Sequence, residues 1–247
     1  MAHYILFDTE TTGNQEQDRI IQVGAMILSV NRDIEVYDEL CSSEQEISLE
    51  AMEVHHITPD MIENKPPYTQ TKFAKRVEEL NSNENYLIAH NISFDLGMIQ
   101  KEGFINKYQL VDTLRCAKHL YPDLSSHRLQ YLRYALGLYK NETLEAKKIG
   151  IAIKAHEAIG DVLILKLLLS KLKEQIIQKF PDQNVMNKLV ALTNTPVLMK
   201  EFKFGKYKGR SIQDIAREDM GYLKWMRKNL DLDDDMCYTL DHHIEQY

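Results

Sequence analysis

The end of the first apolar segment places the strongest constraint on how this 247-residue chain folds. Tyr4–Phe7 is apolar and rich in β-prone residues, and Asp8 and Glu10 lie at its end. Side chains two positions apart on a strand project from the same face, so Leu6, Asp8 and Glu10 share one face. The pattern therefore predicts a strand that carries two carboxylates at the edge of an apolar interior.

Two more acids begin apolar stripes on predicted helices. A helix is expected over 93–102, and Asp95 lies in its first turn, on the stripe that apolar residues continue three and four positions later. A longer helix is expected over 155–178, and Asp161 heads its main apolar stripe. Because this helix is apolar almost all round, it is expected to be buried.

Four ionised carboxylates in apolar surroundings are costly unless positive charge compensates them. They cannot compensate one another, because like charges raise each other's pKa. Either each acid has its own lysine or arginine, or the four together hold divalent cations; each alone could also end a strand or favour a helix N-terminus. Carboxylate oxygens favour Mg²⁺ or Mn²⁺ over Zn²⁺. Two such ions about 3.5–4 Å apart serve in-line displacement at phosphorus.

A histidine precedes the last of these acids. His156 lies five residues before Asp161, a spacing that on a helix separates two side chains by about 140°. His156 is therefore expected just before the helix or in its frayed first turn. There it could take a proton from an attacking water, because the pKa of histidine lies near working pH. The alternative is an ordinary structural histidine.

Three segments resemble the ordered motifs of the DEDD 3′→5′ exonucleases. They are FDTETTG at 7–13, AHNISFD at 89–95 and HEAIGD at 156–161. The His-x4-Asp spacing resembles the histidine subtype of this family, and residues 18–21, 54–58 and 111–114 look familiar too. The resemblance covers residues 3–178 and implies an α/β, ribonuclease H-like fold with a mixed five-stranded sheet flanked by helices.

The same resemblance implies a mechanism and a set of site residues. His156 would activate a water molecule, and nucleoside 5′-monophosphates would leave from a DNA 3′ end. The ligands of two Mg²⁺ or Mn²⁺ ions, also counted as catalytic, would be Asp8, Glu10, Asp95 and Asp161. The backbone and side chains of Thr11 and Thr12 are the candidates for holding the terminal nucleotide, and Asn91 is the candidate for ordering the site.

The chain departs from the family pattern at two positions. Gln22 stands where the family usually has glutamate on the second strand, and Asn14 stands where an apolar residue commonly packs against terminal bases. The other strands are expected over 20–30, 34–40, 86–89 and 109–112, with a turn at 31–32; further helices are expected over 69–80, 114–121 and 126–136.

Charge is unevenly spread along the chain. The net charge of -7 argues, taken alone, against a nucleic-acid partner. Residues 196–230 nevertheless carry nine lysines and arginines against four acids, whereas residues 231–247 carry six acids and neither basic type. We therefore expect an exonuclease domain over 1–180, a linker over 181–195, and a small basic α+β module with an acidic tail over 196–247.

The basic module has its own resemblance. FKFGKYKGR at 202–210, together with residues 214–225, is similar to the C-terminal module of the exonuclease X branch of the family. As a strand or hairpin, 202–210 would place Phe202 and Phe204 on one face. Its candidate nucleic-acid contacts are Lys206, Tyr207 and Lys208. Alternatively, the phenylalanines pack on the Trp225 helix and the lysines are solvated.

Other function classes are excluded or left open. Three widely spaced cysteines exclude a disulfide framework and a Cys-rich zinc site, and no signal peptide or membrane span is expected, which suits the cytoplasm. Single-stranded DNA 3′ ends are the expected substrate, in repair or recombination. An RNA-directed exonuclease and a polymerase proofreading subunit remain alternatives. A non-enzymatic scaffold is disfavoured because all four acids and the histidine are present. The oligomeric state is not specified.

Overall fold

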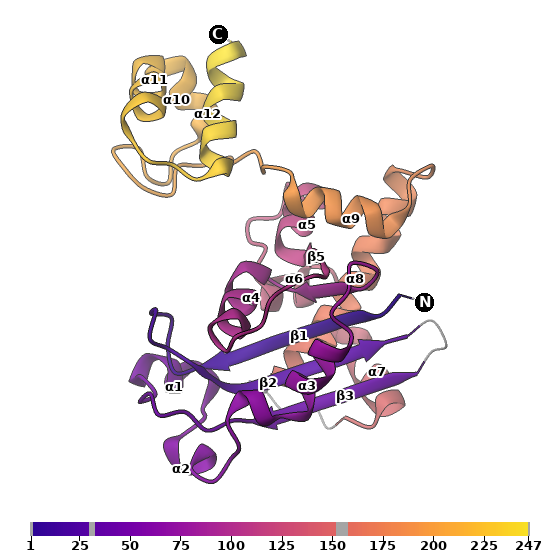
Figure 1. The fold of residues 1–247 in the computed structure, drawn as a ribbon. Coiled ribbons are helices and arrows are strands. Elements are labelled where there is room, and N and C mark those ends of the chain that lie inside the picture. Colours follow the sequence, from indigo (N-terminus) through magenta and orange to yellow (C-terminus); the bar gives the residue numbers. More distant parts are fainter. Residues whose placement is uncertain (1, 30–32, 152–157, 247) are drawn as a thin grey trace. The chain divides into compact units, whose positions relative to one another are not determined.

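The computed structural model describes residues 2–29, 33–151 and 158–246, which form two compact units. In the first unit, residues 1–193, the described residues build a five-stranded sheet with strand order β3-β2-β1-β4-β5 (Figure 1). Strands β1, β2 and β3 are antiparallel, and β4 and β5 run parallel to β1. The strands are β1 (Tyr4–Thr11), β2 (Ile20–Leu28), β3 (Ile34–Leu40), β4 (Tyr86–Ala89) and β5 (Gln109–Asp112). The expected mixed sheet is confirmed.

Helices cover both faces of this sheet. Helices α3 (Lys72–Glu79) and α4 (Ile92–Lys101) pack on one face, over a core that includes Phe7 of β1. The other face, which includes Leu6, is covered by a layer built around the long helix α8. That layer comprises α5 (Thr113–Leu120), α6 (Leu129–Ala135), α7 (Tyr139–Ile149), α8 (Ala158–Lys179) and α9 (Val185–Asn194). Short helices α1 (Leu49–His55) and α2 (Pro59–Ile62) and the 3-10 helix η1 (Tyr68–Gln70) connect β3 to α3.

The segment expected to be a linker is largely helical. Helix α9 occupies most of 181–195 and buries Met186, Leu189 and Leu192 in the same core as α8. The first unit accordingly extends to Thr193 rather than ending at 180. These three apolar residues are spaced three positions apart, so they lie on one side of the helix, and their burial stabilises it. The turn expected at 31–32 lies outside the described residues.

The second unit, residues 194–247, packs three helices around Phe202, Leu223 and Met226. They are α10 (Ile212–Glu218), α11 (Met220–Asn229) and α12 (Asp234–Gln246). Among the described residues of this unit, the extended pairing amounts to one antiparallel bridge between Glu201 and Ser211. Segment 202–210 doubles back through turns at two glycines with positive φ angles, and the ends meet where the Phe202 amide donates to the Arg210 carbonyl at 3.0 Å and the Gly209 amide donates to the Phe202 carbonyl at 2.8 Å.

No helix in the described ranges combines the length and hydrophobicity needed to cross a lipid bilayer.

Candidate active site

Two of the predicted acids lie at the end of β1 on the face that α8 covers. Alternation along β1 places Asp8 and Glu10 on the same side as Leu6, as predicted. Across the strand pair, Glu10 lies opposite Gln22 and Asp8 lies opposite Gly24. The amide of Gln22 donates to Asp38 Oδ1 at 2.8 Å, so the departure from glutamate puts a neutral, hydrogen-bonded group beside Glu10.

Gly24 brings the start of α8 against this strand end. A Cβ atom at Gly24 would lie 2.5 Å from the carbonyl carbon of Ala158 and 2.6 Å from the amide nitrogen of Ile159. Those are backbone atoms that cannot swing away, so only glycine permits this contact. Asp161 follows within the first turn of α8, and its Oδ1 accepts a hydrogen bond from Gln130 Nε2 at 2.6 Å.

Asp95 reaches the same place from the opposite helix layer. It lies in the first turn of α4 and is almost completely buried. Its Oδ1 accepts hydrogen bonds from the backbone amide of Thr9 at 3.0 Å and from the Thr9 hydroxyl at 2.8 Å. Acids from both layers therefore meet at the carboxyl end of the central strand.

The four carboxylates influence one another electrostatically. Burial, followed by Asp95, Glu10 and Asp161, raises the pKa of Asp8 well above its ordinary value. Burial, followed by Asp161 and Asp95, raises the pKa of Glu10 to about 7, and burial raises that of Asp95 to about 7. Among the described residues, no lysine or arginine forms an ion pair with the first three acids. A cluster without paired cations is held either by protons or by cations from solution.

In this conformation the described residues hold no group of three or more histidine, cysteine, aspartate or glutamate side chains arranged to bind a metal ion. The predicted catalytic histidine, His156, lies outside the described residues. Gln130 of α6, which contacts Asp161, was not predicted from the sequence. Helix α6 contains no family motif, and a single glutamine in its first turn does not indicate this contact.

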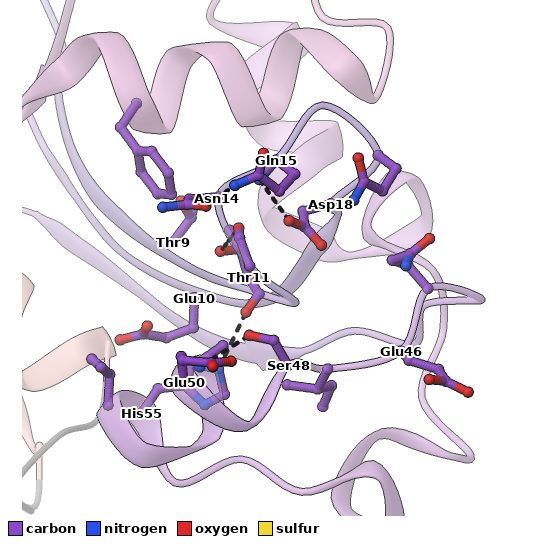
Figure 2. Close-up of a pocket in the computed structure, with 17 residues that line it drawn as sticks. Thr9, Glu10, Thr11, Asn14, Gln15, Asp18, Glu46, Ser48, Glu50 and His55 are labelled. Atoms are coloured by element: carbon purple, nitrogen blue, oxygen red, sulfur yellow. Dashed lines mark hydrogen bonds between the residues drawn. The ribbon is translucent and has the colours of Figure 1, made fainter.

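A cavity of about 840 Å³ opens beside Glu10 (Figure 2). Thr11 lies in its wall, its hydroxyl donating to the Gly13 carbonyl at 2.7 Å and its own carbonyl oxygen 3.2 Å from His55 Nε2. Asn14 also lines the cavity, where the family commonly has an apolar residue. The volume suits a ligand the size of a nucleotide.

Helices α1 and α4 supply the apolar side of this wall. Ala51, Val54 and His55 come from α1, and Phe94 comes from α4. The sequence comparison placed 54–58 in a family-like segment but assigned it no role. Ser48, whose hydroxyl accepts from the Ala51 amide at 3.1 Å, was an available signal for the start of α1.

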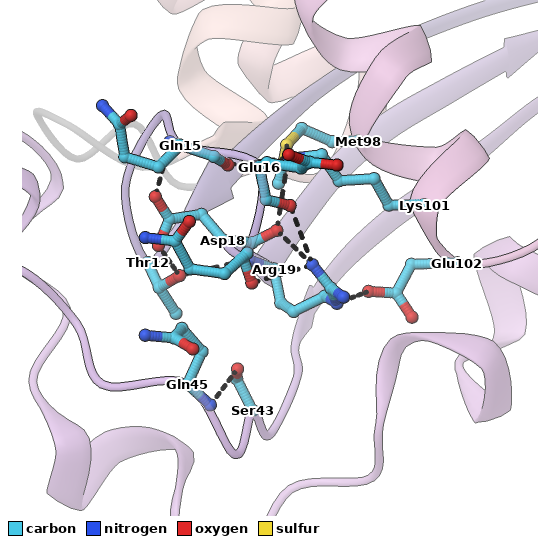
Figure 3. A network of polar contacts seen from close by, with 11 residues as sticks. Thr12, Gln15, Glu16, Asp18, Arg19, Ser43, Gln45, Met98, Lys101 and Glu102 are labelled. Atoms are coloured by element: carbon cyan, nitrogen blue, oxygen red, sulfur yellow. Dashed lines mark hydrogen bonds and ion pairs between the residues drawn. The ribbon is translucent and has the colours of Figure 1, made fainter.

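Thr12 does not line the cavity. Its side chain is fully buried, and its hydroxyl donates to Asp18 Oδ1 at 2.7 Å (Figure 3). Asp18 Oδ2 in turn accepts from the Gln15 amide at 2.6 Å, and Lys101 Nζ donates to the Gln15 carbonyl at 2.8 Å. The Thr12 side chain therefore shapes the loop that follows β1.

Asn91 likewise lies outside the cavity lining. It precedes α4 in the left-handed conformation, with φ of 74°, and its backbone amide donates to Asp112 Oδ1 at 3.1 Å. Its place is the start of the helix that carries Asp95. The structure supports an ordering role through backbone placement rather than through its side chain.

The candidate contacts in the second unit differ from one another. Lys206 Nζ lies 3.2 Å from Asp219 Oδ2, and the Tyr207 hydroxyl donates to the same oxygen at 2.8 Å. Both residues thus make contacts inside the unit, and Tyr207 is half-buried. Lys208 is exposed and forms no ion pair among the described residues. Phe202 is buried whereas Phe204 is 43% exposed, so the two do not share a face as predicted.

Comparison with known families decides the class of this chain. The family model described as exonuclease, of the RNase T type, matches residues 5–169. The chain belongs to this exonuclease family. A second model, described as exodeoxyribonuclease X-like C-terminal, matches residues 202–231. The resemblance predicted from the motifs is confirmed, and members of this exonuclease family generally depend on divalent metal.

The curated relatives differ in how much of this chain, and of their own length, the match covers. Exodeoxyribonuclease 10 of Escherichia coli K12 is 26% identical over 97% of this chain and 98% of that protein. The DNA polymerase III subunit epsilon of Treponema pallidum is 33% identical over 55% of this chain and 65% of that protein. The PolC-type DNA polymerase III of Clostridium perfringens is 30% identical over 70% of this chain, but only 12% of the polymerase is covered.

Solved structures show the same fold. Exonuclease X in complex with 5′-overhanging duplex DNA matches with a TM-score of 0.53 and 19% identity, over 77% of this chain and 99% of that one. E. coli exonuclease I in complex with a dA16 oligonucleotide matches with a TM-score of 0.54 and 19% identity, over 77% and 43%. These likenesses agree with the predicted ribonuclease H-like architecture.

Proposed function

We propose that this chain is a metal-dependent 3′→5′ exodeoxyribonuclease that releases nucleoside 5′-monophosphates from DNA 3′ ends, single-stranded ends above all. The observation that carries the proposal is the convergence of four acids from β1, α4 and α8 beside a nucleotide-sized cavity. Exodeoxyribonuclease 10, which is similar over nearly its whole length, supports DNA as the substrate. The DNA bound in the structural neighbours supports it as well.

The donor chemistry of the four carboxylates suits a divalent-metal centre, although in this conformation of the described residues their side chains are not arranged around one ion. They are hard oxygen donors, and the described residues give Asp8, Glu10 and Asp95 no cationic side chain of their own. The ligands that would hold two Mg²⁺ or Mn²⁺ ions are Asp8, Glu10, Asp95 and Asp161. Bound there, the ions supply a more acidic water and stabilise the charge that develops on the phosphate and on the leaving 3′ oxygen.

The chain's own residues orient and deprotonate the reactants. Thr9 holds the Asp95 carboxylate through two hydrogen bonds, and Gln130 holds that of Asp161. His156 accepts the proton of the attacking water. The terminal nucleotide lies in the cavity beside Glu10, against Thr11 and the apolar wall formed with Phe94. Lys208, and Lys206 once released from Asp219, contact DNA phosphate.

Substitution of single acids tests the metal centre. Asp8→Asn and Asp161→Asn should each abolish release of mononucleotides from 3′-labelled DNA, because each removes a ligand charge. His156→Ala should lower the rate by about 10²–10⁴-fold. Asp182→Asn, which changes an exposed acid of the same unit, serves as the matched control.

Metal binding is measured separately from activity. Mg²⁺ should raise the melting temperature of the wild-type protein and of Asp182→Asn, since an ion that binds the folded state stabilises it. The shift should be smaller for Asp8→Asn. Full Mg²⁺-dependent hydrolysis by Asp8→Asn or by Asp161→Asn would contradict the proposal.

Similarity to polymerase subunits favours one second candidate, a proofreading exonuclease. The match of residues 202–231 to an exodeoxyribonuclease X-like module favours the first. Full activity of the chain without a polymerase would support the first candidate, and matched DNA and RNA oligomers would separate it from an RNA-directed enzyme. We also propose that it acts in the cytoplasm, because Cys41, Cys116 and Cys237 are free thiols. A role in DNA repair or recombination is proposed from the similarity to exodeoxyribonuclease 10.

A further inference from the structure

One side of α11 in the second unit is exposed and basic around the single tryptophan of the chain. Gly221, Lys224, Trp225 and Lys228 are all exposed, and on a helix of 100° per residue they lie within an arc of about 100°. We call these four residues the α11 face. Leu223 and Met226 point to the other side, into the core of the unit.

The lysines of this face are available to a ligand. Among the described residues, Lys224 and Lys228 form no ion pair, unlike Lys206, Arg210 and Arg227 of the same unit. Helix α12, which carries most of the acidic tail, packs against Leu223 and Met226 and so lies on the far side of α11. The α11 face is therefore left with positive charge, although the chain as a whole is acidic.

Trp225 is held ready for a second aromatic partner. Its ring stacks on Tyr222 with centroids 5.9 Å apart and planes 22° apart, yet the residue remains 50% exposed. Tyr222 is itself anchored, because its hydroxyl accepts from the Lys206 amide at 3.1 Å and its ring packs edge-on against Tyr207 at 5.0 Å. The loop that carries the exposed Phe204 thus packs against Tyr222, the residue on which Trp225 stacks.

The sequence indicates Tyr207 as the aromatic contact to nucleic acid, whereas the structure favours Trp225. Tyr207 packs against Tyr222 and donates to Asp219, so its ring is committed inside the unit. Trp225 is half-exposed at one edge of the α11 face, with both lysines on the same side of it. A ring of this kind beside phosphate-binding groups is how proteins hold single strands, because a base can stack while the backbone follows the charge.

We propose that the α11 face binds single-stranded DNA, with an unpaired base stacked on Trp225 and phosphates against Lys224 and Lys228. The choice of DNA rests on the proposed function. Gly221, one turn before Trp225, adds no side chain to this face, and a Cβ there would lie 3.5 Å from Asp219 Oδ1. The second unit would therefore grip substrate through contacts of its own.

Fluorescence of Trp225 tests this directly, because the chain has one tryptophan. The full-length protein is titrated with oligo(dT) without divalent metal, so that no strand is hydrolysed, and is excited at the red edge of tryptophan absorption. Stacking should quench the emission. Anisotropy of labelled oligo(dT) should show Trp225→Leu binding about tenfold more weakly. Tyr238→Leu, an equally exposed aromatic on α12, should bind as wild type.

Charge is tested with a lysine pair. Lys224→Gln with Lys228→Gln should lower the slope of log affinity against log salt by about 1.4, since each phosphate contact on a single strand contributes about 0.7. The matched control, Lys72→Gln with Lys75→Gln on exposed positions of α3, should leave the slope unchanged.

Four outcomes would overturn the proposal. They are unchanged tryptophan emission at saturating oligo(dT), identical affinities of Trp225→Leu and Tyr238→Leu, equal binding of polyglutamate competitor and oligo(dT), and tighter binding of oligo(U) than of oligo(dT). None of these measurements depends on hydrolysis. A chain that binds oligo(dT) here but fails the nuclease assay would refute the proposed function alone.

Discussion

Asp95 depends on one neighbouring threonine for both its orientation and its charge. Two hydrogen bonds from Thr9 converge on the same carboxylate oxygen. Burial raises the pKa of Asp95, and these bonds oppose that rise because they favour the ionised form. The Thr9 side chain supplies one of the two bonds, so its contribution can be removed while the strand amide remains.

Thr9→Val should lower activity by about 10–100-fold at limiting Mg²⁺, the range for a group that orients a metal ligand. The measurement is initial rate against Mg²⁺ concentration, and the expected change is a rightward shift with partial recovery at high Mg²⁺. Thr239→Val removes a comparable hydroxyl bond, 2.7 Å to the Asp235 carbonyl, from the second unit and serves as the control. An unchanged Mg²⁺ dependence would contradict the role of Thr9.

His90 makes stability depend on pH. Its Nε2 lies 2.8 Å from the His127 carbonyl oxygen and its Nδ1 lies 2.9 Å from Thr113 Oγ1. Burial lowers its pKa below 6.5, so the unfolded chain binds a proton first as pH falls. The stabilisation is fully present above about pH 6.5 and is lost as pH falls toward the folded pKa.

Urea unfolding between about pH 7.5 and pH 5.5 checks this effect. Protonation of Asp8, Glu10 and Asp95, whose pKa values are raised, stabilises both proteins as pH falls, so the contribution of His90 is the difference between wild type and His90→Gln. His90→Gln should be less stable than wild type at the upper end, and this difference should shrink toward about pH 5.5. Parallel curves for the two proteins would contradict this role of His90.

At the scale of elements, the contact between β2 and α8 assembles the acids. Gly24 admits the first turn of α8 to the sheet opposite Asp8, and this places Asp161 beside the strand. A substitution at Gly24 thus acts on the site through the position of a helix. No catalytic side chain needs to change.

Gly24→Ala should cost about 1–3 kcal/mol of unfolding free energy, the usual range for overpacking, and should lower activity in the remaining folded protein. Gly97→Ala on α4 is the matched control, because a Cβ there meets no atom within 4 Å. That change should be neutral or stabilising, since alanine favours a helix. Thermal melts and initial rates measure both. Equal effects of the two substitutions would refute the packing argument.

The elements predicted correctly include long apolar ones and also short ones bounded by turn or helix-ending residues, such as β4 and β5. β1, β2 and α8 are buried, so their residues record the period of the structure. α7 is largely polar, so its sequence shows no clear hydrophobic period. α9 lies in a segment too short for its hydrophobic period to indicate a helix. The acids were found because charge in an apolar pattern is unusual. The inward orientation of the Thr12 side chain could not be predicted, because a motif does not reveal which of its side chains are buried.

At the scale of the whole molecule, the two units have separate cores. The boundary of the first unit is marked by Thr193, whose hydroxyl accepts from the Asp112 amide at 2.9 Å and whose carbonyl accepts from Arg115 Nε at 2.8 Å. Helix α9 therefore belongs to the exonuclease unit. A truncation should respect this boundary rather than the one expected from sequence.

A chain ending at 193 should remain folded and retain metal-dependent hydrolysis. A chain ending at 180 loses the three buried apolar side chains of α9, each worth about 1.5–3 kcal/mol, and their sum is comparable to the whole stability of a domain. It should be largely unfolded or insoluble. The test is to measure circular dichroism melts and nuclease rates of the two fragments. Equal melting temperatures would place the boundary at 180.

The four acids lie on elements from both faces of the sheet, so the proposed nuclease activity depends on complete folding of the first unit. Asp95 arrives with one helix layer and Asp161 with the other, so neither half-assembled form has the complete set. A chain still emerging from the ribosome without α8 lacks the fourth carboxylate altogether. Nucleic acid near a nascent or partly unfolded copy is thereby safe from it until folding is finished.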